Sequence, residues 1–172
     1  MKDEEVVDLL RHYRHDLLNH LQLIQGYAQM DKIEKVKENT NNLLNLMSQE
    51  RKLSNLNGPA FTLWVLNFNS TYDLFRLSYK IELDYANLSS IDRTLVHTCE
   101  EMMEQLHKHV SNEQIYNGNL VLYKYNSYIK MKITFEGSFV KHHELKNNLL
   151  REPFVQNIEI DNYGLSIRLW LS

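Results

Sequence analysis

The first part of the chain alternates hydrophobic and polar positions with the period of a helix. From residue 4 to about 29, apolar side chains recur every three or four positions, which places them on one face of a helix. A second stretch from about 32 to 56 repeats this spacing, and Asp31-Lys32 lies at a short turn between the two. The pattern predicts a helical hairpin. Its first stripe is Val6, Leu10, Tyr13, Leu17, Leu21, Ile24 and Ala28, and its second is Ile33, Val36, Thr40, Leu43 and Met47.

The pattern changes after Asn57-Gly58-Pro59, a sequence that ends a helix and breaks the chain. We place a domain boundary there, with the hairpin at 1–57 and a second domain at 58–172. Ser90 or Asp92 is a candidate N-cap for a helix, and Asp161 to Gly164 reads as a hairpin turn. The predicted elements are a helix at 61–77, a strand at 79–85, a helix from about 90 to 110, strands at 120–125 and 128–135, a helix at 140–150, and strands at 154–160 and 165–171. This order predicts an α+β fold, with helices layered on a mixed sheet.

The predicted hairpin has a packing problem, because two helices alone cannot enclose a hydrophobic stripe. Two copies can do so as a four-helix bundle, which predicts a homodimer. Packing of the hairpin against its own C-terminal domain is the competing solution.

Composition narrows the function classes. Of 172 residues, 43% are hydrophobic and the net charge is −3, so no basic surface favours nucleic acid as a partner. The single cysteine, Cys99, excludes an intramolecular disulfide, and we expect it to be buried. No apolar run reaches the roughly 18 residues that a membrane span needs, and the first residues are charged. We therefore expect a cytoplasmic protein with no membrane association.

His15 stands opposite the hydrophobic stripe of the first helix. At ~100° per residue, the stripe lies between ~160° and ~240° from His15, whereas Arg11, Asn19 and Gln22 lie within ~60° of it. His15 is therefore expected to face solvent. A plain solvated histidine is one interpretation. A metal site is another, since His12 precedes it at the i, i+3 spacing, but no third ligand follows on that face.

Exposure of His15 also has a chemical use. A neutral imidazole, whose pKa lies near about 6.5, is a good nucleophile at neutral pH and can carry a phosphoryl group on nitrogen. Asp16 and Asn19 are placed to orient the ring, and Arg11 and Arg14 to offset the phosphoryl charge. Leu18 and Leu23 flank the polar stripe, either as part of a docking surface or as the edge of the bundle core.

The residues around His15 also match a known sequence motif. "RHDLLNHLQLIQG", Arg14 to Gly26, resembles the phosphorylated-histidine motif R-H-D-x-x-N-x-L-Q-x-I-x-G of the sporulation-type phosphotransferases. "KLSNL", Lys52 to Leu56, resembles the end of the second helix in that family.

The resemblance implies a dimeric four-helix bundle, followed by a domain like a histidine-kinase ATPase domain that does not bind ATP. It implies that His15 takes a phosphoryl group from the aspartyl phosphate of one response regulator. His15 then passes the group to the aspartate of a second, a sporulation transcription regulator. No cofactor of its own is expected, because Mg²⁺ comes with the regulator. Arg14, Asp16 and Asn19 map to supporting positions at the phosphoryl site, and Arg11, Leu18 and Gln22 to the partner surface.

Two other interpretations stay open. Sensor kinases share a similar histidine helix, but a kinase needs an N-x-x-x-N-A helix and a D-x-G-x-G loop for Mg²⁺ and ATP. Here the corresponding helix reads "TCEEMMEQLHKHVSN", and Gly118, Gly137 and Gly164 form no such loop. A degenerate sensor kinase is thus one alternative. A non-catalytic dimeric adaptor that binds a kinase or a response regulator is the other.

Overall fold

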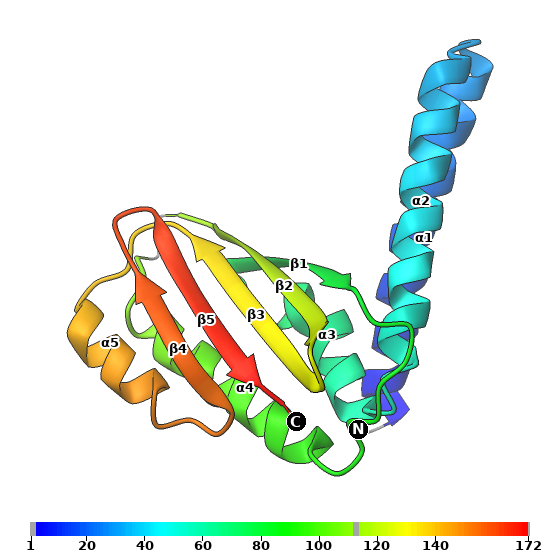
Figure 1. The fold of residues 1–172 in the computed structure, drawn as a ribbon. Coiled ribbons are helices and arrows are strands. Elements are labelled where there is room, and N and C mark those ends of the chain that lie inside the picture. Colours follow the sequence, from blue (N-terminus) through cyan, green and yellow to red (C-terminus); the bar gives the residue numbers. More distant parts are fainter. Residues whose placement is uncertain (1–2, 112–113, 172) are drawn as a thin grey trace. The chain divides into compact units, whose positions relative to one another are not determined.

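A computed structural model describes residues 3–111 and 114–171, and the chain divides into two compact units, one up to Glu50 and one from Arg51 on. The first unit is the predicted helical hairpin, with α1 (Asp3–Gln29) beside α2 (Ile33–Ser54) (Figure 1). The turn lies at Asp31, which adopts a positive φ of 54°. The last turn of α2 belongs to the second unit.

The second unit is a five-stranded mixed sheet with three helices. Its strands lie in the order β1-β2-β3-β5-β4; β1 runs parallel to β2, and the other neighbours are antiparallel. The α+β class is thereby confirmed. The elements are α3 (Pro59–Thr71), β1 (Phe75–Ile81), α4 (Asp92–His107), β2 (Tyr116–Tyr125), β3 (Tyr128–Glu136), α5 (His142–Leu149), β4 (Val155–Ile160) and β5 (Gly164–Trp170).

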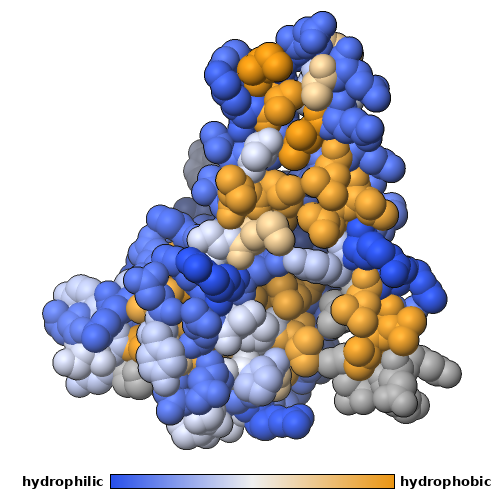
Figure 2. Space-filling model, turned by 90° about the vertical axis from the view of Figure 1, so that its right-hand side faces the viewer, coloured by the Kyte–Doolittle hydropathy of each residue, from blue (hydrophilic) through white to orange (hydrophobic). Residues whose placement is uncertain are grey.

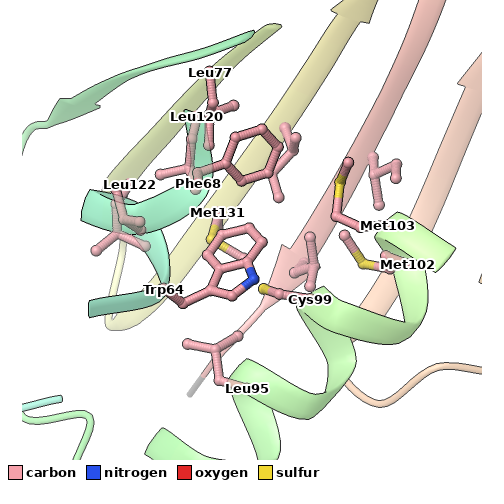
Figure 3. Close-up of a cluster of buried hydrophobic side chains, with 14 of the residues drawn as sticks. Trp64, Phe68, Leu77, Leu95, Cys99, Met102, Met103, Leu120, Leu122 and Met131 are labelled. Carbon is pink, nitrogen blue, oxygen red and sulfur yellow. The ribbon is translucent and has the colours of Figure 1, made fainter. Parts of the chain in front are cut away.

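The core of the second unit lies between the sheet and its helices. Successive strand residues point to opposite faces, so buried side chains alternate with outward ones along β1, β2, β3 and β5. Trp64 and Phe68 of α3 and Cys99, Met102 and Met103 of α4 point into the same space (Figure 3). Cys99 is fully buried, as expected, and burial raises the pKa of its thiol strongly because a thiolate would lose its hydration there.

Three predicted elements were wrong in their bounds. The helix predicted to reach residue 77 ends at Thr71, and the strand predicted at 79–85 is β1, Phe75–Ile81. The Asn69 side chain explains the early strand, since it accepts from the Leu77 N–H at 2.7 Å and donates to the Leu77 carbonyl at 3.1 Å. Similarly, β2 begins four residues earlier than predicted, at Tyr116, which is fully buried and pairs with Phe75.

The prediction that Ser90 or Asp92 caps its own helix was also wrong. The N-cap of α4 is Ile91, and no side chain caps that helix. The buried carboxylate of Asp92 instead accepts from the backbone N–H groups of Ala60 at 2.9 Å and Phe61 at 2.8 Å. It therefore caps α3 and ties the first turns of two helices together.

Candidate functional site

His15 lies on the outer face of α1, and its side chain is 71% exposed. The hydrophobic stripe on the opposite side positions it. Ile24 and Leu17 of that stripe are half-buried within the hairpin, so the helix turns His15 to solvent. The outward orientation predicted from the helical period is confirmed.

One ring nitrogen of His15 is engaged by two neighbours. Its Nδ1 lies 3.2 Å from Oδ1 of Asp16 and 3.3 Å from the side-chain amide of Asn19, one turn further on. A carboxylate can only accept, so the Asp16 contact requires a proton on Nδ1. The amide nitrogen of Asn19 donates, so its contact belongs to the other tautomer, in which Nδ1 carries the lone pair. In the tautomer that pairs with Asp16, the ring presents Nε2, with its lone pair, to solvent.

The two arginines near His15 have different surroundings. Arg11 is held by Asp8, one turn earlier on the same face, with Nη1 2.5 Å from Oδ1. Asp8 was missed in the sequence analysis, although its i, i+3 spacing to Arg11 signals such a pair. Arg14 is exposed, and among the described residues no hydrogen bond or ion pair joins it to His15. The structure thus brings Asp16 and Asn19 to the ring, but not Arg11 or Arg14.

The surface around His15 is polar with hydrophobic borders. Leu18 and Leu23 are 49% and 47% exposed, and Gln22 is exposed between them. Gly26 follows on the same stripe, and a Cβ at that position would meet no atom within 4 Å beyond its chain neighbours and the backbone of its own helix. The face is therefore accessible to a large partner along three helical turns.

A polar contact between the helices lies on the side of α1 opposite His15. The Tyr13 hydroxyl donates to Oε2 of Glu50 at 3.0 Å, linking α1 to α2 two residues before His15. This hydrogen bond is the main reason that the pKa of Tyr13 is raised, with desolvation and the negative charge of Glu50 adding to it. The contact joins the helix that carries His15 to the second helix of the hairpin.

The described part of the second unit repeats one of these contacts, since Nδ1 of His143 lies 3.1 Å from the side-chain amide of Asn147, one turn further on. The segment from Asp161 to Gly164 is the predicted hairpin turn, in which Oδ1 of Asp161 accepts from the N–H groups of Tyr163 at 2.8 Å and Gly164 at 3.0 Å. Among the described residues there is no group of three or more His, Cys, Asp or Glu side chains that could hold a metal ion. No helix in the described part of the chain is both long and apolar enough to span a membrane.

Family models match both parts of the chain. The α-helical domain of the Spo0B-type sensor kinases matches residues 1–56, and the C-terminal domain of sporulation initiation phosphotransferase B matches residues 57–168. Among individual relatives, sporulation initiation phosphotransferase B of Bacillus subtilis (strain 168) is 32% identical over 109 residues. That alignment spans 63% of this chain and 57% of the relative, so less than two thirds of the relative is covered.

Two solved structures with similar folds are histidine kinases. The blue-light activated histidine kinase of Erythrobacter litoralis EL346 is 11% identical, with a TM-score of 0.51 over 98% of this chain and 59% of its own. The catalytic domain of the histidine kinase ThkA is 8% identical, with a TM-score of 0.50 over 68% of this chain and 91% of its own. At these identities the similarity concerns the fold alone.

Proposed function

This chain belongs to the family of sporulation initiation phosphotransferase B, and from that premise we propose that it is a histidine phosphotransferase of a two-component phosphorelay. In this proposal, His15 takes a phosphoryl group from the aspartyl phosphate of one response regulator and delivers it to the aspartate of a second, a regulator of sporulation transcription. The exposed His15 ring, with Nδ1 held by Asp16 and Asn19, is the observation that carries the proposal. The cytoplasmic location expected from the sequence goes with it.

The chemistry needs a nucleophile that is ready before the regulator docks. Nε2 attacks the phosphorus in line, a nitrogen–phosphorus bond forms, and the bond from phosphorus to the aspartyl oxygen breaks. The aspartate leaves as a carboxylate. No proton has to be removed from the ring, because the Nδ1–H tautomer already has its lone pair on Nε2. The second transfer reverses these steps on another aspartate.

Asp16 and Asn19 support the intermediate in this scheme. Phosphorylation of Nε2 makes the ring more positive, and the Nδ1–H···Oδ1 contact with Asp16 offsets that charge. Asp16 is itself 75% exposed, so the interaction is screened by solvent and remains weak. A weak interaction suits a relay, because a strongly stabilised phosphohistidine would not pass its phosphoryl group on. Mg²⁺ is proposed to arrive with the response regulator.

We propose that the hairpin functions within a homodimer. Up to Glu50, only Leu43 is buried among the described hydrophobic side chains, while Leu10 is 59%, Leu21 47% and Leu44 59% exposed. Apolar side chains gather in patches along the hairpin, the upper part of the view in Figure 2. A second hairpin would cover these side chains and complete a four-helix bundle. Sedimentation of the full chain across a range of concentrations tests this, and a monomer at micromolar concentration contradicts it.

The proposal includes no use of ATP. The hairpin turn at Asp161–Gly164 connects β4 directly to β5, and its single glycine leaves no D-x-G-x-G loop there. Titration with Mg²⁺-ATP, followed by calorimetry, is expected to show no binding. Saturable binding of ATP would instead favour a degenerate sensor kinase.

The decisive experiment loads one response regulator with labelled phosphate through its own kinase, removes ATP, and adds this protein. We expect acid-labile, base-stable label on the wild type and its transfer to a second regulator. His15→Ala should abolish both, while His20→Ala, on the same helix, serves as the matched control and should retain both. Label on the His15→Ala variant would refute the proposed role of His15. Regulator binding without any labelled intermediate would favour the adaptor.

A further inference from the structure

The sheet of the second unit has two unlike faces. The helices α3 and α4 lie behind it in Figure 1, and no helix of the described second unit covers the front. Buried positions alternate with outward ones along β3 and β5. The outward positions therefore form a surface of their own. We call it the open face; its central part is made by β2, β3 and β5.

Cations lie next to each other at the centre of the open face. Lys132 of β3 is directly opposite Arg168 of β5, and Lys130 is two residues from Lys132 on the same side. Like charges placed directly opposite each other destabilise a sheet. Arg168 has a partial counter-charge in Glu159, at 3.2 Å. The Lys132 side chain has none, since among the described residues it forms no side-chain hydrogen bond or ion pair.

Exposed aromatic rings border these cations. Nζ of Lys130 lies 4.0 Å from the ring centre of Tyr125 and 4.2 Å from that of Trp170, and Tyr128 stacks on Trp170 with ring centres 6.0 Å apart. The three rings remain 45–55% exposed. The position of Lys130 is explained by its cation–π contacts with these rings at the end of the sheet. They do not explain Lys132.

We propose that the open face around Lys130, Lys132, Arg168 and Trp170 is a docking surface for an acidic segment of a partner protein. Tyrosine, tryptophan and arginine are the residues that dominate protein–protein hot spots. An acidic side chain seated between Lys132 and Arg168 would remove the repulsion that the free protein carries there.

The excess of positive charge on the open face favours a short acidic protein segment as the partner. The outward positions of the five strands carry five cations, Arg76, Lys80, Lys130, Lys132 and Arg168, but only two carboxylates, Glu136 and Glu159. The whole chain, by contrast, has a net charge of −3. A long polyanion such as a nucleic acid meets repulsion outside this surface. A short acidic protein segment touches only the cationic part.

The test is an NMR titration of the full, ¹⁵N-labelled chain with a short peptide of glutamates around one phenylalanine. Shifts should be confined to β2, β3 and β5, and a peptide with glutamine in place of glutamate should not bind. Lys132→Glu should weaken binding at least about tenfold, as expected for reversing a charge at a charged contact. Lys146→Glu, the same change at an exposed position of α5, should alter the affinity by less than about twofold.

A second variant separates docking from folding. Lys132→Thr removes the cation opposite Arg168 and introduces a residue that strands favour, so its thermal stability should equal or exceed that of the wild type. It should nevertheless lose peptide binding. Unchanged binding in Lys132→Glu, binding of the glutamine peptide, shifts outside the open face, or no shifts at millimolar peptide would each overturn the proposal. So would tighter binding of a thymidine oligonucleotide of the same length. None of these results bears on phosphate transfer by His15.

Discussion

The helical hairpin and the sheet unit differ in how far they bury their hydrophobic side chains. In the sheet unit, Phe68, Phe75 and Phe135 are almost completely buried in one continuous core. In the hairpin, side chains of similar hydrophobicity remain about half exposed along both helices. The sheet unit therefore buries its hydrophobic side chains by itself, whereas the hairpin leaves many of its own exposed. The part to which we assign the chemistry is thus also the part that we propose to dimerise.

The largest effect on this comparison is expected from Phe135→Ala. Phe135 packs against Phe75 and Phe68, with ring centres 5.1 Å and 6.2 Å away. Its truncation should lower the free energy of unfolding of the sheet unit by about 3–5 kcal/mol, through lost burial and the cavity left behind. Urea unfolding followed by the fluorescence of Trp64, which lies in the same core, measures this loss.

The matched change in the hairpin is Leu21→Ala, at a side chain that is 47% exposed. It should leave the urea midpoint of the sheet unit unchanged, but weaken self-association of the full chain in sedimentation experiments. Equal losses of unfolding free energy in the two variants would contradict the distinction between a complete and an incomplete unit.

Asp92→Ala is expected to have the next largest effect. It removes two hydrogen bonds from a buried carboxylate to the N–H groups of Ala60 and Phe61, leaving those donors without their partner. The cost should be about 2–3 kcal/mol in the sheet unit. Asp92→Asn keeps an acceptor and should cost less. If the urea midpoint of Asp92→Ala equals that of the wild type, the proposed link between α3 and α4 contributes nothing to the stability of the sheet unit.

Tyr13→Phe tests the hairpin with a smaller change. It deletes the hydroxyl that donates to Glu50 and should destabilise the pairing of α1 with α2 by about 1 kcal/mol. Amide hydrogen exchange in α1 should become faster, while exchange in the sheet unit stays as it was. His15 should still accept phosphate, because Asp16 and Asn19 remain in place. Complete loss of transfer would show that the register of α1 matters more than these two neighbours.

The smallest effect is expected from Glu152→Gln in the sheet unit. Partial burial, with help from the charge of Glu101, raises the pKa of Glu152, and His97 opposes the shift. A carboxyl whose pKa is higher in the folded state stabilises the protein at low pH. This contribution is lost as the pH rises from the unfolded-state pKa through the folded-state pKa. The variant should therefore be slightly more stable than the wild type at neutral pH and equal to it at a pH below the ordinary glutamate pKa. Thermal unfolding at both pH values checks the sign.

Short-range sequence patterns predicted the helical hairpin well and the sheet unit less well. The three-to-four spacing from Val6 to Ala28 predicted both the first helix and the outward position of His15, because helical geometry relates residues that are close in the chain. In the sheet unit, residues 72–78 were assigned wrongly. Their strand depends on pairing with β2, some forty positions later, and on the Asn69 side chain, neither of which is visible in a local window.

The same contrast holds for the sites. The sequence alone determined that His15 faces away from the hydrophobic stripe and that Asp16 and Asn19 are its nearest candidates, since all three lie within about one helical turn. Only the tertiary structure showed that Asp92 caps another helix and that Lys132 faces Arg168 on an uncovered sheet. Pairing across a sheet, and capping between helices, join residues that are far apart in the chain. Their positions are therefore decided by the packing of the whole unit, whereas the face of a single helix is decided by its own period.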